Sequence, residues 1–339
     1  MDLRPFRVLL WTAAALLAVE LGLESRAVSR GWEGFLLGKH AGWNTNLDER
    51  YGPSAEFPFR SLAIQPERDP TRLRLWLASS SYGEDIQLMA DEIFPNQLVD
   101  ELAAGGLAAD MLNASRAGLH VRANSLQLAE LGPLWRPDVV LLYQMSNDID
   151  RISELDARAA AGAEPGTPGV GNHASVTGLG PIARWTERMT TYHHLKTQIT
   201  TRLTRARILS DDLGEDGEAL YLAWVTEFVE AARNLGAEPV LCTFATSHGT
   251  ADLDQLPTPY EQQILSINVE LSMQGWVATV ERWNAGLKQM ARDEGLLLVD
   301  VAAEMRGRPG LFRDFWHFTP EGHKRVAGVI ARTLLEARR

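Results

Sequence analysis

Short apolar runs alternate with longer amphipathic segments from about residue 71 to the end of the chain. Runs of this length, bounded by Gly, Pro or Ser, predict β-strands. The run over residues 139–143 is apolar at every position, as expected for a strand covered on both faces of a parallel sheet. The predicted strands cover residues 73–78, 109–113, 139–143, 239–244 and 296–300.

Apolar residues recur every three or four positions between these strands, which predicts amphipathic helices. The last helix should begin after Thr319, a favourable N-cap, with Pro320 at its first position. One predicted helix carries Leu126, Leu128 and Leu131 and stops at Gly132-Pro133. The other predicted helices cover residues 84–102, 218–234, 277–293 and 320–335. Strands and helices that alternate in this way predict one α/β domain over residues 71–339, with a parallel five-stranded sheet and helices on both faces.

Two stretches break this alternation. Residues 25–70 read as an irregular lead-in that is rich in Gly, Pro, Asn and aromatic residues. Residues 151–215 form an excursion, with an Ala/Gly/Pro-rich loop over 159–181 and a helical stretch over 190–205. Long insertions often serve as lids over active sites, but an excursion without consequence fits the same composition.

The N-terminus has the composition of an export signal. Arg4 and Arg7 precede an apolar run over residues 8–19, which Glu20 interrupts. Residues 1–24 are therefore predicted to form a signal or membrane anchor that is retained, although the run is short for a membrane span. The protein would then be exported and tethered to the inner membrane, facing the periplasm. Secretion after cleavage and an amphipathic helix of a cytoplasmic protein are the alternatives.

Composition narrows the possible partners. The formal net charge is -11 and no basic patch stands out, which argues against a nucleic-acid partner. Cys242 is the single cysteine, so an internal disulfide or a cysteine-based zinc site is excluded. It lies in an apolar run and is predicted to be a buried structural thiol. We predict no metal or other cofactor, and the sequence carries no information on oligomeric state.

The residues that follow the predicted strands carry the candidate chemistry. In parallel α/β sheets, active sites lie beyond the carboxyl ends of the strands. Asp314 and His317 lie in the loop before the last helix, at a spacing that lets the carboxylate hold one imidazole nitrogen while the other faces outward. The remaining candidates are Ser79, Ser80 and Ser81 after the first strand, Asn113 and Gly118 after the second, and Asn147 after the third. A hydroxyl nucleophile, oxyanion donors and an oriented base are thus predicted at one edge of the sheet.

These motifs resemble, in order, the four sequence blocks of the SGNH (GDSL-type) hydrolases. The segment Leu77-Ala78-Ser79-Ser80-Ser81-Tyr82-Gly83 is similar to the first block, with Ser79 as the nucleophile four residues before the glycine. Ser80 or Ser81 would take that role if the strand ended later. The resemblance implies a flavodoxin-like sheet, a catalytic triad of Ser79, His317 and Asp314, and an oxyanion hole of the Ser79 and Gly118 N–H groups and the Asn147 amide. The chain also resembles membrane-anchored bacterial members that are found with surface polysaccharides.

The chain departs from the family pattern at two positions. Leu77-Ala78 stands where the family has Gly-Asp, and Met145 replaces the glycine of the third block. The function that we expect is a serine esterase that hydrolyses O-acyl esters, notably acetyl esters, of an acylated small molecule or polysaccharide through an acyl-serine. The alternatives are a polysaccharide O-acetyltransferase and a catalytically silent carbohydrate-binding or assembly protein with the same fold.

Other polar and aromatic residues have simpler interpretations. His323 is expected on a helix face, and Asp148 is expected to order the loop behind Asn147. The pairs His193-His194 and Asp211-Asp212 are expected at the solvated surface, because adjacent side chains rarely converge on one metal ion. Helix packing accounts for the tryptophans Trp135, Trp224, Trp276 and Trp283.

Overall fold

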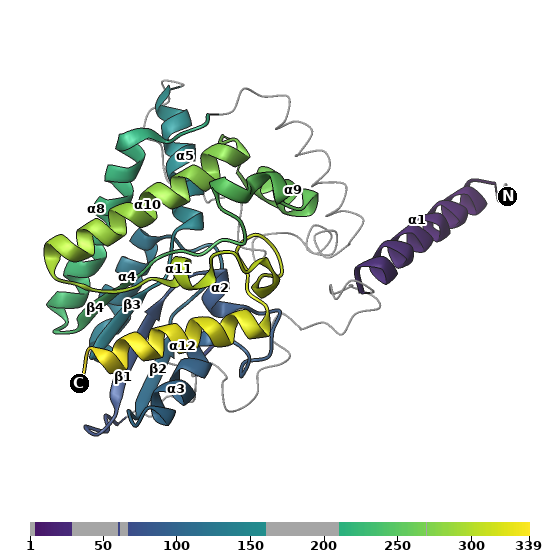
Figure 1. Ribbon diagram of the computed structural model, residues 1–339. Coiled ribbons are helices and arrows are strands. Elements are labelled where there is room, and N and C mark those ends of the chain that lie inside the picture. The colour runs from purple at the N-terminus through teal and green to yellow at the C-terminus, as the bar shows by residue number, and fades with distance from the viewer. Residues whose placement is uncertain (1–3, 29–59, 62–66, 161–209, 269) are drawn as a thin grey trace.

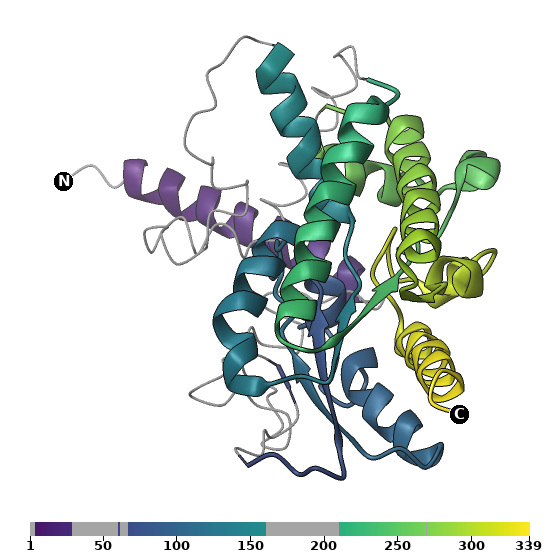
Figure 2. The same cartoon turned by 90° about the vertical axis from the view of Figure 1, so that its left-hand side faces the viewer.

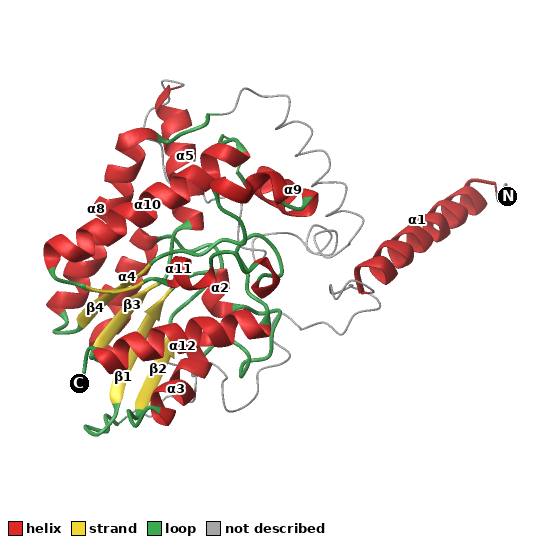
Figure 3. Ribbon diagram, in the orientation of Figure 1, coloured by secondary structure: helices red, strands yellow, loops and turns green. Residues whose placement is uncertain are grey.

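The computed structural model describes residues 4–28, 60–61, 67–160, 210–268 and 270–339. Five parallel strands form one sheet in the order β2-β1-β3-β4-β5 (Figures 1 and 3). The strands are β1 Leu73–Ala78, β2 Ala109–Asn113, β3 Val139–Leu142, β4 Glu238–Cys242 and β5 Leu297–Val299. This is the flavodoxin-like strand order. The predicted parallel five-stranded α/β sheet is therefore confirmed.

Helices cover both faces of the sheet (Figure 2). Helices α3 (Phe94–Ala104) and α12 (Pro320–Glu336) pack against each other on one face. Helices α4 (Val121–Trp135), α8 (Gly214–Asn234) and α10 (Met273–Glu294) lie on the other. Because both faces are covered, every residue of β3 is buried. The remaining elements are α1 Arg4–Val28, α2 Ser81–Glu84, α5 Ser146–Ala160, η2 Thr250–Gln255, α9 Thr258–Ile267, α11 Val301–Met305 and η3 Pro309–Leu311.

Local sequence signals place several helix ends correctly. The Thr319 hydroxyl accepts a hydrogen bond from the Gly322 N–H at 3.2 Å, and Pro320 occupies the first position of α12. Helix α10 ends at Gly295, whose φ of 64° is the left-handed conformation that favours glycine. The four tryptophans assigned to helix packing are all buried. Cys242 is buried as predicted, and burial raises the pKa of its thiol to about 12.

The predicted helix over residues 84–102 is confirmed only from Phe94 onward, where α3 runs to Ala104, and its predicted start is wrong. The chain instead forms α2, leaves helical geometry at Asp85, where φ is 28°, and starts α3 only at Phe94. Tertiary contacts cause the break, because the Asp85 side chain bonds to Arg313 and the Phe94 N–H donates to the His323 ring. A local sequence pattern does not report partners that are more than 200 residues away.

Two further boundaries differ from the prediction. Helix α4 does not stop at Gly132-Pro133 but runs to Trp135, whose indole N–H donates to the Leu75 carbonyl at 3.2 Å and holds the last turn against β1. Helix α5 begins at Ser146, although the pattern predicted a loop there. The predicted loop at 161–181 and the predicted helix at 190–205 lie outside the described residues.

Part of the lead-in belongs to the α/β body. Arg60 and Ser61 are buried, the Ser61 hydroxyl accepts the Asn113 N–H at 2.8 Å, and the Arg60 carbonyl accepts the Asn113 side-chain amide at 3.1 Å. These bonds attach the lead-in to the end of the edge strand β2. Helix α1 lies apart from the sheet in Figure 1. None of the helices in the described ranges has both the length and the hydropathy that a membrane span requires.

Candidate active site

The loop between η3 and α12 orients a histidine. Asp314 Oδ1 accepts the backbone N–H groups of Trp316 at 3.0 Å and His317 at 2.8 Å. Its second oxygen, Oδ2, lies 2.7 Å from His317 Nδ1. The carboxylate therefore closes a tight turn and holds the imidazole through one nitrogen, which leaves Nε2 to face outward. This is the arrangement that the Asp-x-x-His spacing predicts.

Asp314 remains ionised in this setting. Burial acts to raise the pKa of its carboxyl group, but the charge and hydrogen bonds of His317 and the N–H of Trp316 outweigh burial and lower that pKa to about 2. An ionised carboxylate at Nδ1 fixes the tautomer in which Nδ1 carries the proton and Nε2 has a free lone pair. His317 can therefore accept a proton at Nε2.

The hydroxyl that meets His317 belongs to Ser81. Ser81 Oγ lies 2.9 Å from His317 Nε2. Ser81 is the first residue of α2, and it lies just beyond the carboxyl end of β1. The exposed fraction of the His317 side chain is 21%, so solvent reaches the pair. Asp314, His317 and Ser81 thus form a continuous hydrogen-bonded array.

The structure contradicts the placement of Ser79 in this array. Ser79 is fully buried, and its hydroxyl donates to the Tyr143 carbonyl at 2.7 Å. It faces the neighbouring strand, away from His317. The strand ends at Ala78 as predicted, but two non-helical residues, Ser79 and Ser80, separate it from α2, which begins at Ser81. Of the alternatives that the sequence left open, the structure brings Ser81 to the base.

The two predicted oxyanion residues have different environments. Gly118 lies in the loop after β2 with φ of 83°, and neither its N–H nor that of Ser81 donates to another residue in the described part of the chain. The Asn147 side-chain amide donates to Ser80 Oγ and to the Leu119 carbonyl, the latter at 2.7 Å. Both amide hydrogens of Asn147 are therefore engaged, so this side chain is not a free donor in the present state.

A buried network around Asp148 supports the start of α5, which carries Asn147. The Asp148 carboxylate accepts the Val121 N–H at 2.8 Å and the Gln144 amide at 2.9 Å. Burial raises the pKa of Asp148 to about 7. The Tyr82 hydroxyl donates to the Gln144 side-chain oxygen at 2.7 Å. These contacts fit the predicted structural role of Asp148.

Close packing explains the glycine at position 83, two residues after Ser81. A Cβ on Gly83 would lie 2.3 Å from Ser115 Oγ and 2.9 Å from Ser79 Cβ. The Asn113 side chain adds a hydrogen bond to the Gly83 carbonyl at 2.9 Å. A larger residue at position 83 would push α2, and Ser81 with it, away from the sheet.

Leu77 and Met145, the two departures from the family pattern, are fully buried in the hydrophobic core.

The sequence analysis missed two groups of residues near the array. One follows β4: the Ser247 N–H donates to the Phe315 carbonyl at 2.9 Å, and the His248 ring contacts Tyr260. Their position at the carboxyl end of a strand was the signal that could have identified them. The other group is Asp85, Arg313 and His323. His323 lies on a helix face as predicted, and that face of α12 is fully buried.

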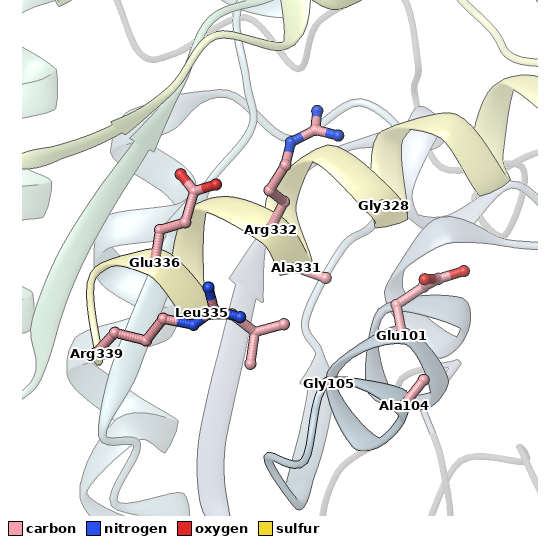
Figure 4. Close-up of a pocket in the computed structure, with 9 residues that line it drawn as sticks. All are labelled: Glu101, Ala104, Gly105, Gly328, Ala331, Arg332, Leu335, Glu336 and Arg339. Atoms are coloured by element: carbon pink, nitrogen blue, oxygen red, sulfur yellow. The ribbon is translucent and has the colours of Figure 1, made fainter.

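A concavity lies away from this array. Its volume is about 290 Å³, and it lies between the C-terminal parts of α3 and α12, lined by residues that include Glu101, Arg332 and Leu335 (Figure 4). His317 precedes the opposite, N-terminal end of α12. The cavity therefore contributes nothing to the triad. Of the two predicted surface pairs, Asp211 accepts the Ser272 hydroxyl and Asp212 pairs with Arg282, while residues 193–194 lie outside the described residues.

The chain is similar to known proteins in structure but not significantly in sequence. No family model matches the chain, and no curated protein matches it significantly. Among solved structures, it is similar to a GDSL-like lipase from Bacteroides thetaiotaomicron, with 11% identity, a TM-score of 0.46 and coverage of 81% of this chain and 93% of that one. It is also similar to an acetylxylan esterase from Geobacillus stearothermophilus, with 15% identity, a TM-score of 0.46 and coverage of 78% and 95%.

Proposed function

We propose that this protein is a serine esterase. The observation that carries the proposal is the hydrogen-bonded array of Asp314, His317 and Ser81. Asp314 Oδ2 lies 2.7 Å from His317 Nδ1, and His317 Nε2 lies 2.9 Å from Ser81 Oγ. In the first half-reaction, Ser81 Oγ attacks the acyl carbon while its proton passes to His317 Nε2. The protonated imidazole then gives this proton to the leaving alkoxide, and an acyl-serine remains. Water attacks the acyl-serine with His317 again as the base, which releases the acid.

The negative charge that forms on the acyl oxygen needs donors beside Ser81. We propose the backbone N–H groups of Ser81 and Gly118, which no other described residue engages. The Asn147 amide can join them only if its bonds to Ser80 and the Leu119 carbonyl yield. One such donor typically contributes ~2.7–4 kcal/mol to transition-state stabilisation.

The substrate class that we propose is an O-acetyl ester on a carbohydrate. The four sequence motifs that resemble the SGNH hydrolases support an ester substrate. The partial exposure of His317 supports water as the acceptor, because water can reach the base that must activate it. For this reason we favour hydrolysis over acetyl transfer to a polysaccharide. The assembled triad argues against a catalytically silent binding protein.

Covalent trapping tests the proposal directly. We expect the full-length protein to hydrolyse p-nitrophenyl acetate and to release acetate from O-acetylated oligosaccharides. A fluorophosphonate should phosphonylate Ser81, with loss of fluoride, because the reagent needs the same attack by an activated hydroxyl. Peptide mass spectrometry would locate the adduct. A folded protein that neither turns over the ester nor takes up the reagent would support the binding-protein alternative.

We also propose that α1 attaches the protein to the inner membrane, with the α/β domain in the periplasm. Among the side chains of α1 that the structure describes, the exposed large apolar ones are Trp11, Leu16, Leu17 and Val19. Arg4 and Arg7 precede them in the sequence. Exposed apolar side chains around a helix favour transfer from water into a bilayer. In cell fractionation, the full chain should sediment with membranes, and a variant without residues 1–28 should remain in the supernatant. Equal distribution of the two proteins would exclude the attachment through α1.

A further inference from the structure

An ion pair between a buried aspartate and a partly buried arginine joins the element that carries Ser81 to the loop that carries His317. Asp85 follows α2 directly, and its carboxylate oxygens accept hydrogen bonds from Arg313 Nη2 at 2.7 and 2.6 Å. The exposed fraction of the Asp85 side chain is 2%. Arg313 directly precedes Asp314. One contact therefore spans the nucleophile helix and the base loop.

Arg313 also fixes the base loop on both sides of His317. Its backbone N–H donates to the His317 carbonyl at 2.8 Å, and its Nε donates to the Phe318 carbonyl at 2.7 Å. Its remaining terminal nitrogen, Nη1, donates to the Gln87 side chain at 2.6 Å. Each part of the guanidinium thus has a partner, and these partners determine where the loop lies relative to Asp85.

His323 is the third member of this group. Its Nδ1 accepts the Phe94 N–H at 3.1 Å, so the ring proton must be on Nε2, which lies 2.9 Å from Asp85 Oδ2. Burial is the main factor that lowers the pKa of His323. The neutral ring can therefore donate to Asp85 without adding a second buried positive charge. This contact ties the first turns of α3 and α12 to the ion pair.

The backbone at Asp85 is held from the opposite side. The Arg60 guanidinium donates to the carbonyls of Glu84, Asp85 and Leu88. Asp85 has φ of 28°, a conformation that non-glycine residues adopt only where surrounding contacts enforce it. Arg60 supplies contacts of this kind, and so it fixes the direction in which the Asp85 carboxylate leaves the end of α2.

We propose that Asp85, Arg313 and His323 form a positioning cluster that sets the distance between Ser81 Oγ and His317 Nε2; this inference rests on the proposed esterase function. None of the three side chains takes part in the Asp314–His317–Ser81 array. Buried ion pairs often contribute little net stability, and in some proteins buried polar groups instead fix the register of the elements that they join. Proton transfer depends strongly on geometry, and a displacement of about 1 Å can cost about 10²-fold in rate.

The Asp85→Asn substitution in the full-length protein tests the positioning cluster. We expect the second-order rate of fluorophosphonate labelling and the kcat for p-nitrophenyl acetate each to fall about 10²-fold. KM should change little, because the cluster does not face the ester. Arg313→Lys keeps the positive charge but cannot reproduce all the hydrogen bonds of the planar guanidinium, so it should lower the labelling rate and kcat by a smaller factor. This milder variant covers the case in which Asp85→Asn does not fold.

Arg74→Met provides the matched control. Arg74 is also a buried arginine, with a hydrogen bond to the Trp135 carbonyl at 2.7 Å, but it lies near the start of β1, at the opposite edge of the sheet from Ser81. This variant should lower the melting temperature while the folded protein keeps the parent labelling rate. If Asp85→Asn behaved in the same way, the cluster would be only structural and the proposal would be overturned.

Hydrogen–deuterium exchange provides a readout that does not depend on esterase activity. The N–H groups of Arg313, Trp316, His317 and Thr319 are hydrogen-bonded within the base loop. We expect faster exchange in a peptide over 312–319 in Asp85→Asn and not in Arg74→Met. If the parent protein is inert but this exchange responds, then the esterase proposal fails and the positioning role stands. If exchange is unchanged in Asp85→Asn, the positioning role fails whatever the activity of the parent.

Discussion

Replacement of Ser81 by alanine is expected to abolish ester hydrolysis. The substitution removes the hydroxyl that lies 2.9 Å from His317 Nε2, so no acyl-serine can form. In other serine hydrolases, loss of the nucleophile lowers kcat by about 10⁶-fold, and the remaining rate comes from binding and oxyanion stabilisation. Initial rates with p-nitrophenyl acetate and the loss of fluorophosphonate labelling would measure this effect.

The Ser79→Ala variant is the control for this experiment. It removes a buried hydrogen bond to the Tyr143 carbonyl, which contributes about 1 kcal/mol to the free energy of unfolding. We expect the melting temperature to fall while the folded protein keeps most of its activity. The reverse result, with an inactive Ser79→Ala and an active Ser81→Ala, would restore the assignment made from the sequence motif.

The second large effect is expected for Asp314→Asn. An amide at this position can still accept the N–H groups of Trp316 and His317, so the turn should persist. It no longer provides the negative charge that keeps the proton on Nδ1 and stabilises the imidazolium. In other triads this change lowers kcat about 10⁴-fold. Steady-state kinetics should show this loss in kcat with little change in KM, whereas a variant with the parent kcat would exclude a catalytic contribution from the Asp314 carboxylate.

The same variant has a stability signature that depends on pH. The pKa of Asp314 is about 2 in the folded protein, below the ordinary value of 3.8, so the ionised group stabilises the fold above about pH 4. That contribution, about 2 kcal/mol, is lost as the pH falls through 2. Urea unfolding should therefore show a difference between the parent and Asp314→Asn at pH 7 that decreases as the pH falls below 4. A constant difference would mean that the change acts through packing alone.

Much of the fold could be predicted because its causes are local in sequence. The strand β3 is apolar at every position, and Thr319-Pro320 combines an N-cap with a residue suited to the first helical turn. The Asp314–His317 pair was also predictable, because both residues lie in one tight turn. In each of these cases the partners lie within a few residues of one another.

The nucleophile could not be assigned because its position depends on tertiary contacts. Ser79, Ser80 and Ser81 have the same chemistry, and their roles differ only in what they face: the Tyr143 carbonyl, the Asn147 amide and the His317 ring. These partners come from elsewhere in the chain. The end of α2 at Asp85 was missed for the same reason, since Arg313 and His323 determine it.

The engaged state of Asn147 has a consequence for inhibitors. Its amide already donates to Ser80 and to the Leu119 carbonyl. A hydrogen bond from Asn147 to a tetrahedral adduct on Ser81 would replace one of these bonds, so the net gain in binding free energy from this side chain is small. The Ser81 and Gly118 N–H groups lose no protein partner in the described part of the chain when they bind an oxyanion. Boronate affinity should therefore depend more on these two backbone groups than on the Asn147 amide.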